Sequence, residues 1–453
     1  MAGWLHKNKK NVTVRSGGHS FACFSTCNTT DCYVLNLSNL KTVAVDAEAL
    51  TATVGAGVTM QELYDALWTP HKLAFAGGST NTVGVAGLAL GGGLGFLMRN
   101  HGLAADNVLA MKVALYNGTV VTASPTTHAD LYWGLRGAGH ANFGVVLEFT
   151  LRVVDASATF QYLHYTPAAG VTAAACFDAW QSRVLAPAFP REAYSQFSMG
   201  TYMANPTGYQ ILLVFNGSLA DARALFADVP ELAPPQCIDP ASGGPPPPGV
   251  TCTDMSWADV YQLFGPVADG RALTAFSRFS FAPVAAATFA ATAAAFGAVK
   301  EKGCTPIWGD VLIDAVGGAV ADAPAAASAF PWRNARLSFQ YNAFWLPSQS
   351  ADNAASCRAW LHDVYEAGDA DKKAFAPDAA YDNYPHVGDE FAQGKWEAKY
   401  YGDGWAKLQQ LKKSYDPQCF LGNYAQAVRP PACEEELPFS AGRHHLRHAS
   451  KSV

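Results

Sequence analysis

The sequence has 453 residues, with 31 basic and 37 acidic side chains, which gives a formal net charge of −6. Half of the residues are apolar and 15% are charged, a balance that excludes a disordered or fibrous chain. The mild acidity argues against nucleic acid as a partner, because binding phosphates requires a concentrated basic face. A globular protein of two or three domains that binds a small molecule is the default expectation.

The cellular compartment is suggested by cysteines and glycosylation sequons rather than by a leader. The first twenty residues lack the apolar core of a signal peptide, so the chain looks cytosolic or truncated. Clustered cysteines at 23, 27 and 32, and Cys237 and Cys252 around a proline-rich loop, suit disulfides better than zinc. We expect a secreted or vacuolar glycoprotein, and scattered thiols with chance sequons are the alternative. The sequons begin at Asn11, Asn28, Asn36, Asn117 and Asn216.

Two uncharged stretches could be mistaken for membrane spans. Val83–Met98 contains six glycines in sixteen residues, which disfavours a spanning helix. Ala282–Val299 is alanine-rich and contains Pro283, Thr288 and Thr292, so it is more typical of a buried or amphipathic helix. We expect no membrane partner.

Short β-branched runs alternate with glycine-rich turns in the first third of the chain. They predict strands at 12–14, 33–35, 51–54, 113–115 and 144–149. Thr59 and Glu62 form a capping-box pattern, which predicts a helix over Met60–Trp68. This part is therefore expected to be α+β.

The middle of the chain has longer strand patterns and alanine-rich helices. Strands are predicted at 210–215 and 337–342, and the proline-rich segment 234–250 is predicted to be a surface loop. The composition changes near Pro377, where a tyrosine-rich segment begins. The histidine-containing tail is predicted to be disordered, with metal binding as the alternative.

The segment Arg15-Ser16-Gly17-Gly18-His19-Ser20 follows a predicted strand directly. Its two glycines allow successive N–H groups to point into one concavity, which is typical of a loop that binds pyrophosphate oxygens. A histidine in such a loop would lie against the phosphate-bearing ligand. A simple β-turn with a surface histidine is the alternative.

The second notable segment is Gly77–Gly95, in which eight of nineteen residues are glycine. Hydroxyl-bearing side chains and little bulk suit a backbone that approaches a large flat ligand closely, and a packing seam is the alternative. The segment does not match G-x-G-x-x-G, and the chain lacks a P-loop, so a Rossmann domain or a nucleotide triphosphatase is disfavoured. G-x-S-x-G and H-E-x-x-H, the motifs of serine hydrolases and zinc proteases, are also missing.

These two segments resemble the flavin domain of the vanillyl-alcohol-oxidase (PCMH-type) superfamily, and in particular its berberine-bridge-enzyme-like branch. The resemblance covers residues 11–155 and 330–426. Further matching motifs are Gly102–Asn107, Asp130–Gly139, Asn142–Val146, Tyr381–Tyr384 and Tyr400–Gly402.

The resemblance implies an α+β fold. It places a PCMH-type FAD-binding domain, built of two small α/β subdomains, at residues 1–155. A substrate-binding domain, with an antiparallel sheet covered by helices, follows at 156–370. Residues 371–426 would return to the FAD domain, and 427–453 would form the tail. The strands that usually precede the first loop are nearly missing.

The resemblance also implies that FAD is attached covalently to His19 through its 8α-methyl group. Many members use a second attachment to cysteine, but Thr80 occupies that position, so we expect a single attachment. The residues that the resemblance assigns to cofactor binding are Arg15, Ser16, Gly17, Gly18, His19, Ser20, Gly78, Thr80, Thr82, Gly84, Gly87, Gly92, Asn142, Gly144, Val145 and Tyr401.

The implied reaction moves a hydride from the carbon of a small-molecule alcohol or sugar to FAD and then reduces O₂ to H₂O₂. The resemblance matches Tyr381 to the catalytic base, Gln340 to its polar partner and Val83 to the residue that admits oxygen. A dehydrogenase with another acceptor, or a flavin- or carbohydrate-binding protein without turnover, are the alternatives. The binding-protein alternative is suggested by Ser338 in place of a lysine, Gly404 in place of an asparagine, Thr80 and the short N-terminus. His140 in place of a glycine is a further departure.

Overall fold

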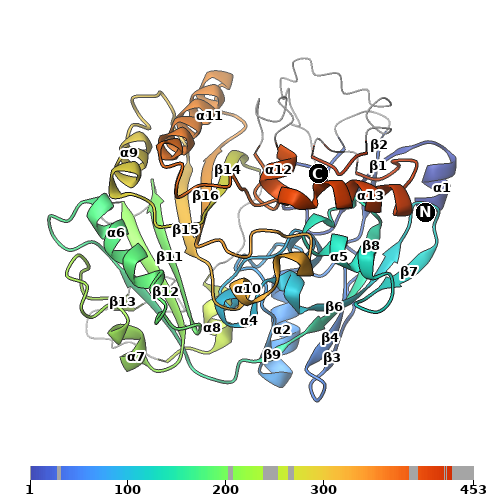
Figure 1. Cartoon of the computed structure of the whole chain (residues 1–453), viewed down its shortest axis with the longest axis horizontal. Coiled ribbons are helices and arrows are strands. Elements are labelled where there is room, and N and C mark those ends of the chain that lie inside the picture. Colours follow the sequence, from blue (N-terminus) through green and yellow to red (C-terminus); the bar gives the residue numbers. More distant parts are fainter. Residues whose placement is uncertain are drawn as a thin grey trace.

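The computed structural model describes residues 2–27, 32–201, 208–237, 254–263, 270–386, 396–422, 424 and 426–430. Its N-terminal part contains a five-stranded antiparallel sheet in the order β3-β4-β8-β6-β7 (Figure 1). These strands are β3 (Val43–Asp46), β4 (Thr51–Gly55), β6 (Val108–Ala114), β7 (Val120–Ala123) and β8 (Val145–Arg152).

Next to this sheet, β1 (Asn11–Arg15) and β2 (Cys32–Asn36) form a separate two-stranded parallel sheet. The predicted helix is α2 (Met60–His71), and its capping box between Thr59 and Glu62 is confirmed. The helix is three residues longer than predicted. The predicted strands are confirmed too, although 113–115 is only the end of the longer strand β6.

The middle of the chain forms a seven-stranded antiparallel sheet in the order β13-β10-β12-β11-β15-β16-β14. Its strands are β10 (Phe160–Tyr165), β11 (Ala193–Gly200), β12 (Tyr209–Asn216), β13 (Gln236–Cys237), β14 (Ala272–Ser280), β15 (Trp308–Ala315) and β16 (Leu337–Trp345). Three helices cover its outer face: α6 (Ala173–Val184), α9 (Ala286–Gly297) and α11 (Ala351–Glu366) (Figure 1).

The two faces of this sheet differ in chemistry because side chains alternate along each strand. Phe197, Val311 and Phe339 point into the apolar core beneath the three helices. Their neighbours Gln196 and Asp310 belong to the opposite face, which is polar in its centre. The sheet therefore combines an apolar face beneath the helices with a face that is polar in its centre and largely buried.

The C-terminal segment returns to the N-terminal part of the molecule. Helix α13 (Trp405–Tyr415) packs against α5 (Ala129–Ala138), and α12 (Trp396–Tyr401) precedes it (Figure 1). The remaining short helices and strands are α1 (Ala2–Lys7), β5 (Leu73–Ala74), α3 (Val85–Leu90), α4 (Met98–His101), β9 (Val154–Asp155), α7 (Leu219–Ala224), α8 (Trp257–Gln262) and α10 (Ala319–Asp322).

The α+β class is thus confirmed, with a helix-covered antiparallel sheet beside the N-terminal part. The predicted domain boundaries stay predictions. The proline-rich loop lies outside the described residues except for its first residues, 234–237, and so does the tail from residue 431 onward. The glycine-rich segment contains α3, a short helix that the sequence analysis did not predict.

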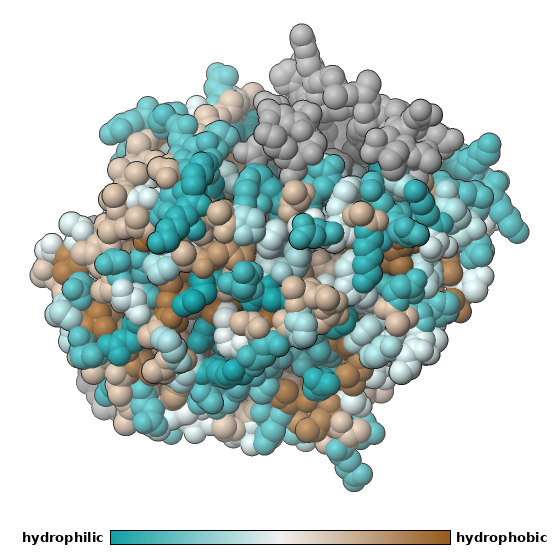
Figure 2. All heavy atoms as spheres, in the orientation of Figure 1, coloured by the Kyte–Doolittle hydropathy of each residue, from teal (hydrophilic) through white to brown (hydrophobic). Residues whose placement is uncertain are grey.

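Two disulfides join described cysteines, Cys27–Cys32 and Cys304–Cys357. The first confirms part of the predicted cysteine cluster, and Cys23 is a free thiol. Across the described ranges, every helix is too short or too polar to cross a bilayer. Figure 2 shows that hydrophobic residues on the viewed face are scattered among hydrophilic ones rather than gathered in a band.

Candidate active site

The two glycine-rich segments meet through their backbones. A Cβ atom on Gly17 would lie 2.4 Å from the Gly84 nitrogen, and one on Gly84 would lie 2.5 Å from the Gly17 nitrogen. Ser16 Oγ donates to Ala56 O at 2.6 Å and fixes the first loop from the other side. The sequence folds in this way because only glycine permits such close contact. Two motifs that are about sixty residues apart in the sequence thus form one surface.

This surface fits a large polar ligand such as FAD. Asn81 Oδ1 and Thr82 Oγ1 are buried and lack a hydrogen-bond partner among the described residues, which a buried polar atom normally has. A Cβ atom on Gly87 would meet no heavy atom within 4 Å, so space is open beside α3. A bound dinucleotide would supply hydrogen bonds of the kind that these two atoms lack.

The first loop also presents a cation and the candidate attachment residue. Gly18 has a φ of +78°, and a Cβ there would lie 3.0 Å from Arg15 Nε, so the Arg15 guanidinium folds over the loop. His19 follows directly and is half-buried. Ser20 Oγ accepts a hydrogen bond from Phe24 N at 3.1 Å and stabilises the following turn. The assignment of His19 as the covalent attachment site stays a prediction.

Tyr381 lies against the second glycine-rich segment. Its phenol oxygen accepts hydrogen bonds from Gly93 N at 2.8 Å, Leu94 N at 3.2 Å and Asn383 Nδ2 at 2.6 Å. Burial raises the pKa of Tyr381 to about 12 in spite of the hydrogen bonds from Asn383, Gly93 and Leu94, which act in the opposite direction. The fold therefore brings the predicted base onto the surface that fits the cofactor.

Gln340 reaches the same neighbourhood through the pairing of β14 with β16. It is the register partner of Ser277, whose Oγ accepts from Tyr381 N at 3.0 Å and donates to Tyr384 O at 2.9 Å. Gln340 Nε2 donates to Asn342 Oδ1 at 3.2 Å. Ser277 thus links the strand that carries Gln340 to the turn that carries Tyr381.

The polar face of the sheet continues from Gln340 with two buried carboxylates on β15. Asp310 accepts from Asn342 Nδ2 at 2.7 Å and from Trp308 Nε1. Burial raises the pKa of Asp310 to about 6, although these hydrogen bonds oppose the shift. Asp314 accepts from Tyr194 Oη at 2.6 Å, and burial raises the pKa of Asp314 as well. Both acids raise the pKa of Tyr384 electrostatically, in addition to its burial.

His140, one of the departures from the family pattern, ties the C-terminal turn to the glycine-rich segment. Its Nδ1 lies 3.0 Å from Asp382 Oδ2, and its Nε2 lies 2.9 Å from Gly87 O. Burial disfavours the imidazolium, but the Asp382 carboxylate and the Gly87 carbonyl raise the pKa of His140 above its ordinary value. Tyr401 Oη donates to the same Asp382 oxygen at 3.3 Å.

Most of the remaining predicted residues make contacts within the protein that stabilise its fold. The Asn142 side chain donates to Ala138 O and accepts from Tyr424 Oη and Val428 N, so protein groups engage both of its polar atoms. A Cβ on Gly144 would lie 2.4 Å from Val113 Cγ1. The other predicted residues are described by their backbones. Gly78 O accepts a hydrogen bond from Tyr64 Oη, and Val83 N donates to Thr80 O in one turn. Gly92 has a positive φ, and Val145 pairs with Ala114 in the sheet. Their contacts with a cofactor stay predictions.

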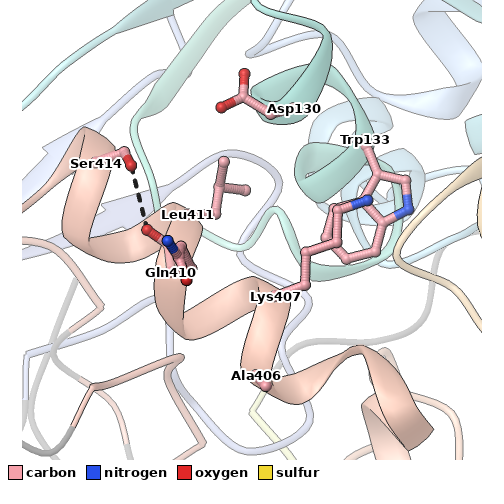
Figure 3. Close-up of a pocket in the computed structure, with 7 residues that line it drawn as sticks. All are labelled: Asp130, Trp133, Ala406, Lys407, Gln410, Leu411 and Ser414. Carbon is pink, nitrogen blue, oxygen red and sulfur yellow. Dashed lines mark hydrogen bonds between the residues drawn. The ribbon is translucent and has the colours of Figure 1, made fainter.

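A separate surface pocket of about 340 Å³ lies between α5 and α13 (Figure 3). Asp130, Trp133 and Lys407 line it, and Lys407 Nζ lies 3.6 Å from the centre of the Trp133 ring. None of the residues predicted for the active site lines this pocket.

Sequence reasoning missed the carboxylates of β15 and the role of Asn383. A signal for Asp310 and Asp314 was present, because two acids spaced by four lie on one face of an otherwise apolar strand. Asn383 was part of a quoted motif, but its contact with Tyr381 depends on a turn that the sequence does not reveal.

Comparisons with known proteins agree with the resemblance to flavin-binding proteins. The family described as "FAD binding domain" matches residues 2–124, and "Berberine and berberine like" matches residues 380–428. Berberine bridge enzyme-like 24 of Arabidopsis thaliana is 28% identical over 92% of this chain and 78% of its own length. Tetrahydroberberine oxidase of Berberis wilsoniae is 26% identical over 92% of this chain and 80% of its own.

Solved structures give the same result. BBE-like 1 of Physcomitrella patens superimposes with a TM-score of 0.77 at 27% identity, over 94% of this chain and 88% of that one. A chitooligosaccharide oxidase has a TM-score of 0.79 at 24% identity, over 95% of this chain and 88% of that one, and shows the shared fold. The two domain matches, the relatives and the solved structures support the berberine-bridge-enzyme-like branch of the PCMH-type flavoprotein superfamily, as the motifs indicated, and they support an FAD-binding oxidoreductase.

Proposed function

We propose that the chain is an FAD-dependent oxidase of CH–OH groups. A small-molecule alcohol would lose a hydride from carbon and a proton from oxygen to become a carbonyl compound, and O₂ would take up the two electrons to form H₂O₂. The observation that carries the proposal is the contact of Tyr381 Oη with the Gly93 and Leu94 amides. This contact supports the proposal because the phenol, as the proposed proton acceptor, lies against the segment that would hold the cofactor.

Bound FAD supplies the hydride acceptor, and the residues of this chain do the remaining work. Tyr381 takes the hydroxyl proton as charge develops on the alcohol oxygen. Gln340 binds that hydroxyl from the opposite strand, and Val83 leaves room for O₂ beside the second loop. His19 holds FAD covalently, and Thr80 lines the site without forming a second bond.

The polar face of the seven-stranded sheet supports a hydroxyl-rich substrate. Asp310, Asp314 and Asn342 present carboxylate and amide groups on this face, and such groups pair with sugar hydroxyls. The buried Ser338 Oγ on the same face lacks a partner within the described part of the chain. Likeness to a chitooligosaccharide oxidase points in the same direction. A sugar is therefore the first substrate class to test, and an aromatic or allylic alcohol the second.

Anaerobic mixing with sugars and alcohols tests the proposal. An oxidisable substrate bleaches the flavin absorbance, and air then restores it within seconds with one H₂O₂ per flavin. Bleaching followed by reoxidation over many minutes would indicate a dehydrogenase with another acceptor. FAD that no alcohol or sugar reduces would indicate a binding protein without turnover.

Tyr381→Phe tests the base directly. Flavin reduction should slow by roughly 10²–10⁴-fold, because general-base catalysis by a positioned side chain contributes that much. Tyr415→Phe is the matched control, because it removes a phenol on α13 that donates a hydrogen bond to Asp130 on α5. An unchanged reduction rate in Tyr381→Phe would leave Tyr381 as a core aromatic residue.

We further propose that the protein matures in the secretory pathway or the vacuole. The Cys27–Cys32 and Cys304–Cys357 disulfides support an oxidising compartment. Asn11, Asn36 and Asn117 are exposed and accessible to glycosylation. Treatment with an N-glycosidase should raise the gel mobility of protein from its native source, and an unchanged mobility would contradict glycosylation.

A further inference from the structure

The oxygen of Tyr381 has an unusual set of neighbours. Three N–H groups donate to it, those of Gly93, Leu94 and Asn383. Among the described residues, no group accepts a hydrogen bond from it. A neutral phenol needs an acceptor for its proton, whereas a phenolate only accepts. These three donors therefore favour the ionised form, and they oppose the burial that raises the pKa of the Tyr381 phenol to about 12.

The directions of the three donors are determined by the fold. Asn383 Nδ2 also donates to Leu88 O at 3.1 Å, and a carbonyl only accepts, so the amide nitrogen must face both oxygens. Gly93 has a φ of +85°, and a Cβ there would lie 2.4 Å from Ala104 Cβ. Such a glycine turn directs the successive N–H groups of Gly93 and Leu94 toward one oxygen, which is an anion-binding arrangement.

The charges around Tyr381 are balanced by His140. Asp382, the next residue, disfavours the phenolate by repulsion, and the phenol of Tyr384 lies on the other side at 5.0 Å between ring centres. His140 faces an acceptor with each ring nitrogen, Asp382 Oδ2 and Gly87 O. Both nitrogens can donate only in the imidazolium, so His140 places a positive charge against Asp382. Phe279 and Phe330 complete the surroundings with apolar rings.

We propose that the Gly93 and Leu94 amides and the Asn383 side chain form an anion site for the Tyr381 phenolate, with Asn383 and His140 as positioning residues. This inference rests on the proposed function. In the reaction, the substrate O–H bond breaks, a Tyr381 O–H bond forms, and the hydride leaves the same substrate for FAD. The alcohol is oxidised by two electrons, FAD is reduced, and the phenol later returns its proton to water.

Ionisation at position 381 can be measured without a substrate. Fluorotyrosine introduced at position 381 of the FAD-loaded protein reports its protonation through the fluorine NMR shift over a pH titration. Asn383→Leu should raise the apparent pKa by about 1–2 units, the shift expected for one lost hydrogen bond to a charged group. Asn383→Asp should raise it further, because a carboxylate replaces the donor. His140→Gln should raise it by removing the charge that balances Asp382.

Asn353→Leu is the control, because Asn353 is a buried asparagine on α11 that bonds to Thr305 instead. An unchanged titration in both Asn383 variants would overturn the proposal, and so would an equal shift in the control. Given an oxidisable alcohol, the pH profile of flavin reduction should move upward by the same amount with the same limiting rate. A structural defect would instead lower the rate at every pH. Failure to find a substrate would overturn the proposed function and leave the titration result standing.

Discussion

Asp310 is a buried carboxylate whose protonation is coupled to folding. Its pKa rises from 3.8 to about 6 on folding, so the folded state binds the proton more tightly. Its contribution to stability is fully present below pH 4 and is lost as the pH rises through 6. Asp310→Asn removes the titration. Between pH 4 and pH 7 the variant should gain about 2 kcal/mol in unfolding free energy relative to the parent protein.

Urea unfolding at a series of pH values measures this difference. The amide changes the hydrogen bonds to Trp308 and Asn342 at every pH, so only the pH-dependent part of the difference tests the prediction. Parallel stability curves for the two proteins would show that Asp310 does not titrate in this range.

Among individual residues, the sequence predicted those that belong to short local motifs. Gly17 and Gly84 lie in the glycine-rich segments, and their mutual contact explains why glycine is needed there. Tyr381 followed from a C-terminal motif. Asp310 and Asn383 could not be predicted in the same way, because their neighbours come from strands and turns distant in sequence.

At the scale of helices and strands, a buried ion pair at the end of helix α13 stabilises the C-terminal segment. Lys412 Nζ donates to Asp416 Oδ2 at 2.7 Å, and both side chains are fully buried. The same ammonium donates to Asn142 O and Leu421 O, so it joins the C-terminal segment to the loop before β8. Lys412→Met leaves the Asp416 charge buried without a cation and should cost about 3–5 kcal/mol.

Thermal or urea unfolding measures this loss, and Lys413→Met is the matched control because Lys413 is exposed on the same helix. A loss equal to that of the control would mean that Asp416 is compensated in another way.

The sequence predicted elements well where a periodic pattern coincided with a cap. Helix α2 followed from its capping box and strand β12 from its apolar run. Helix α3 was not predicted, since glycines at both ends and in its middle conceal a helix that tertiary packing stabilises. The order of strands in the two sheets depends on long-range pairing, and it was not predicted from the sequence.

At the scale of the whole molecule, the two disulfides that join described cysteines differ in the length of chain that they close. Cys304–Cys357 spans 53 residues and joins the segment after α9 to α11, whereas Cys27–Cys32 spans 5. In the loop-entropy treatment, closing the longer loop stabilises the folded state by about 4 kcal/mol and the shorter by about 2 kcal/mol.

Replacing each pair with alanines and following thermal unfolding compares the two. The Cys304→Ala/Cys357→Ala protein should show the larger loss of unfolding free energy. Equal losses would mean that strain or residual structure outweighs the closure entropy.

The visible spectrum of the purified protein before and after acid precipitation tests the central claim most directly. We predict a flavin spectrum and a yellow pellet, because FAD would be bonded to His19, and a pellet from His19→Ala that loses its colour to the supernatant. Flavin released from the unaltered chain would contradict the covalent attachment. A colourless protein that stays colourless after incubation with FAD would contradict the flavin site itself.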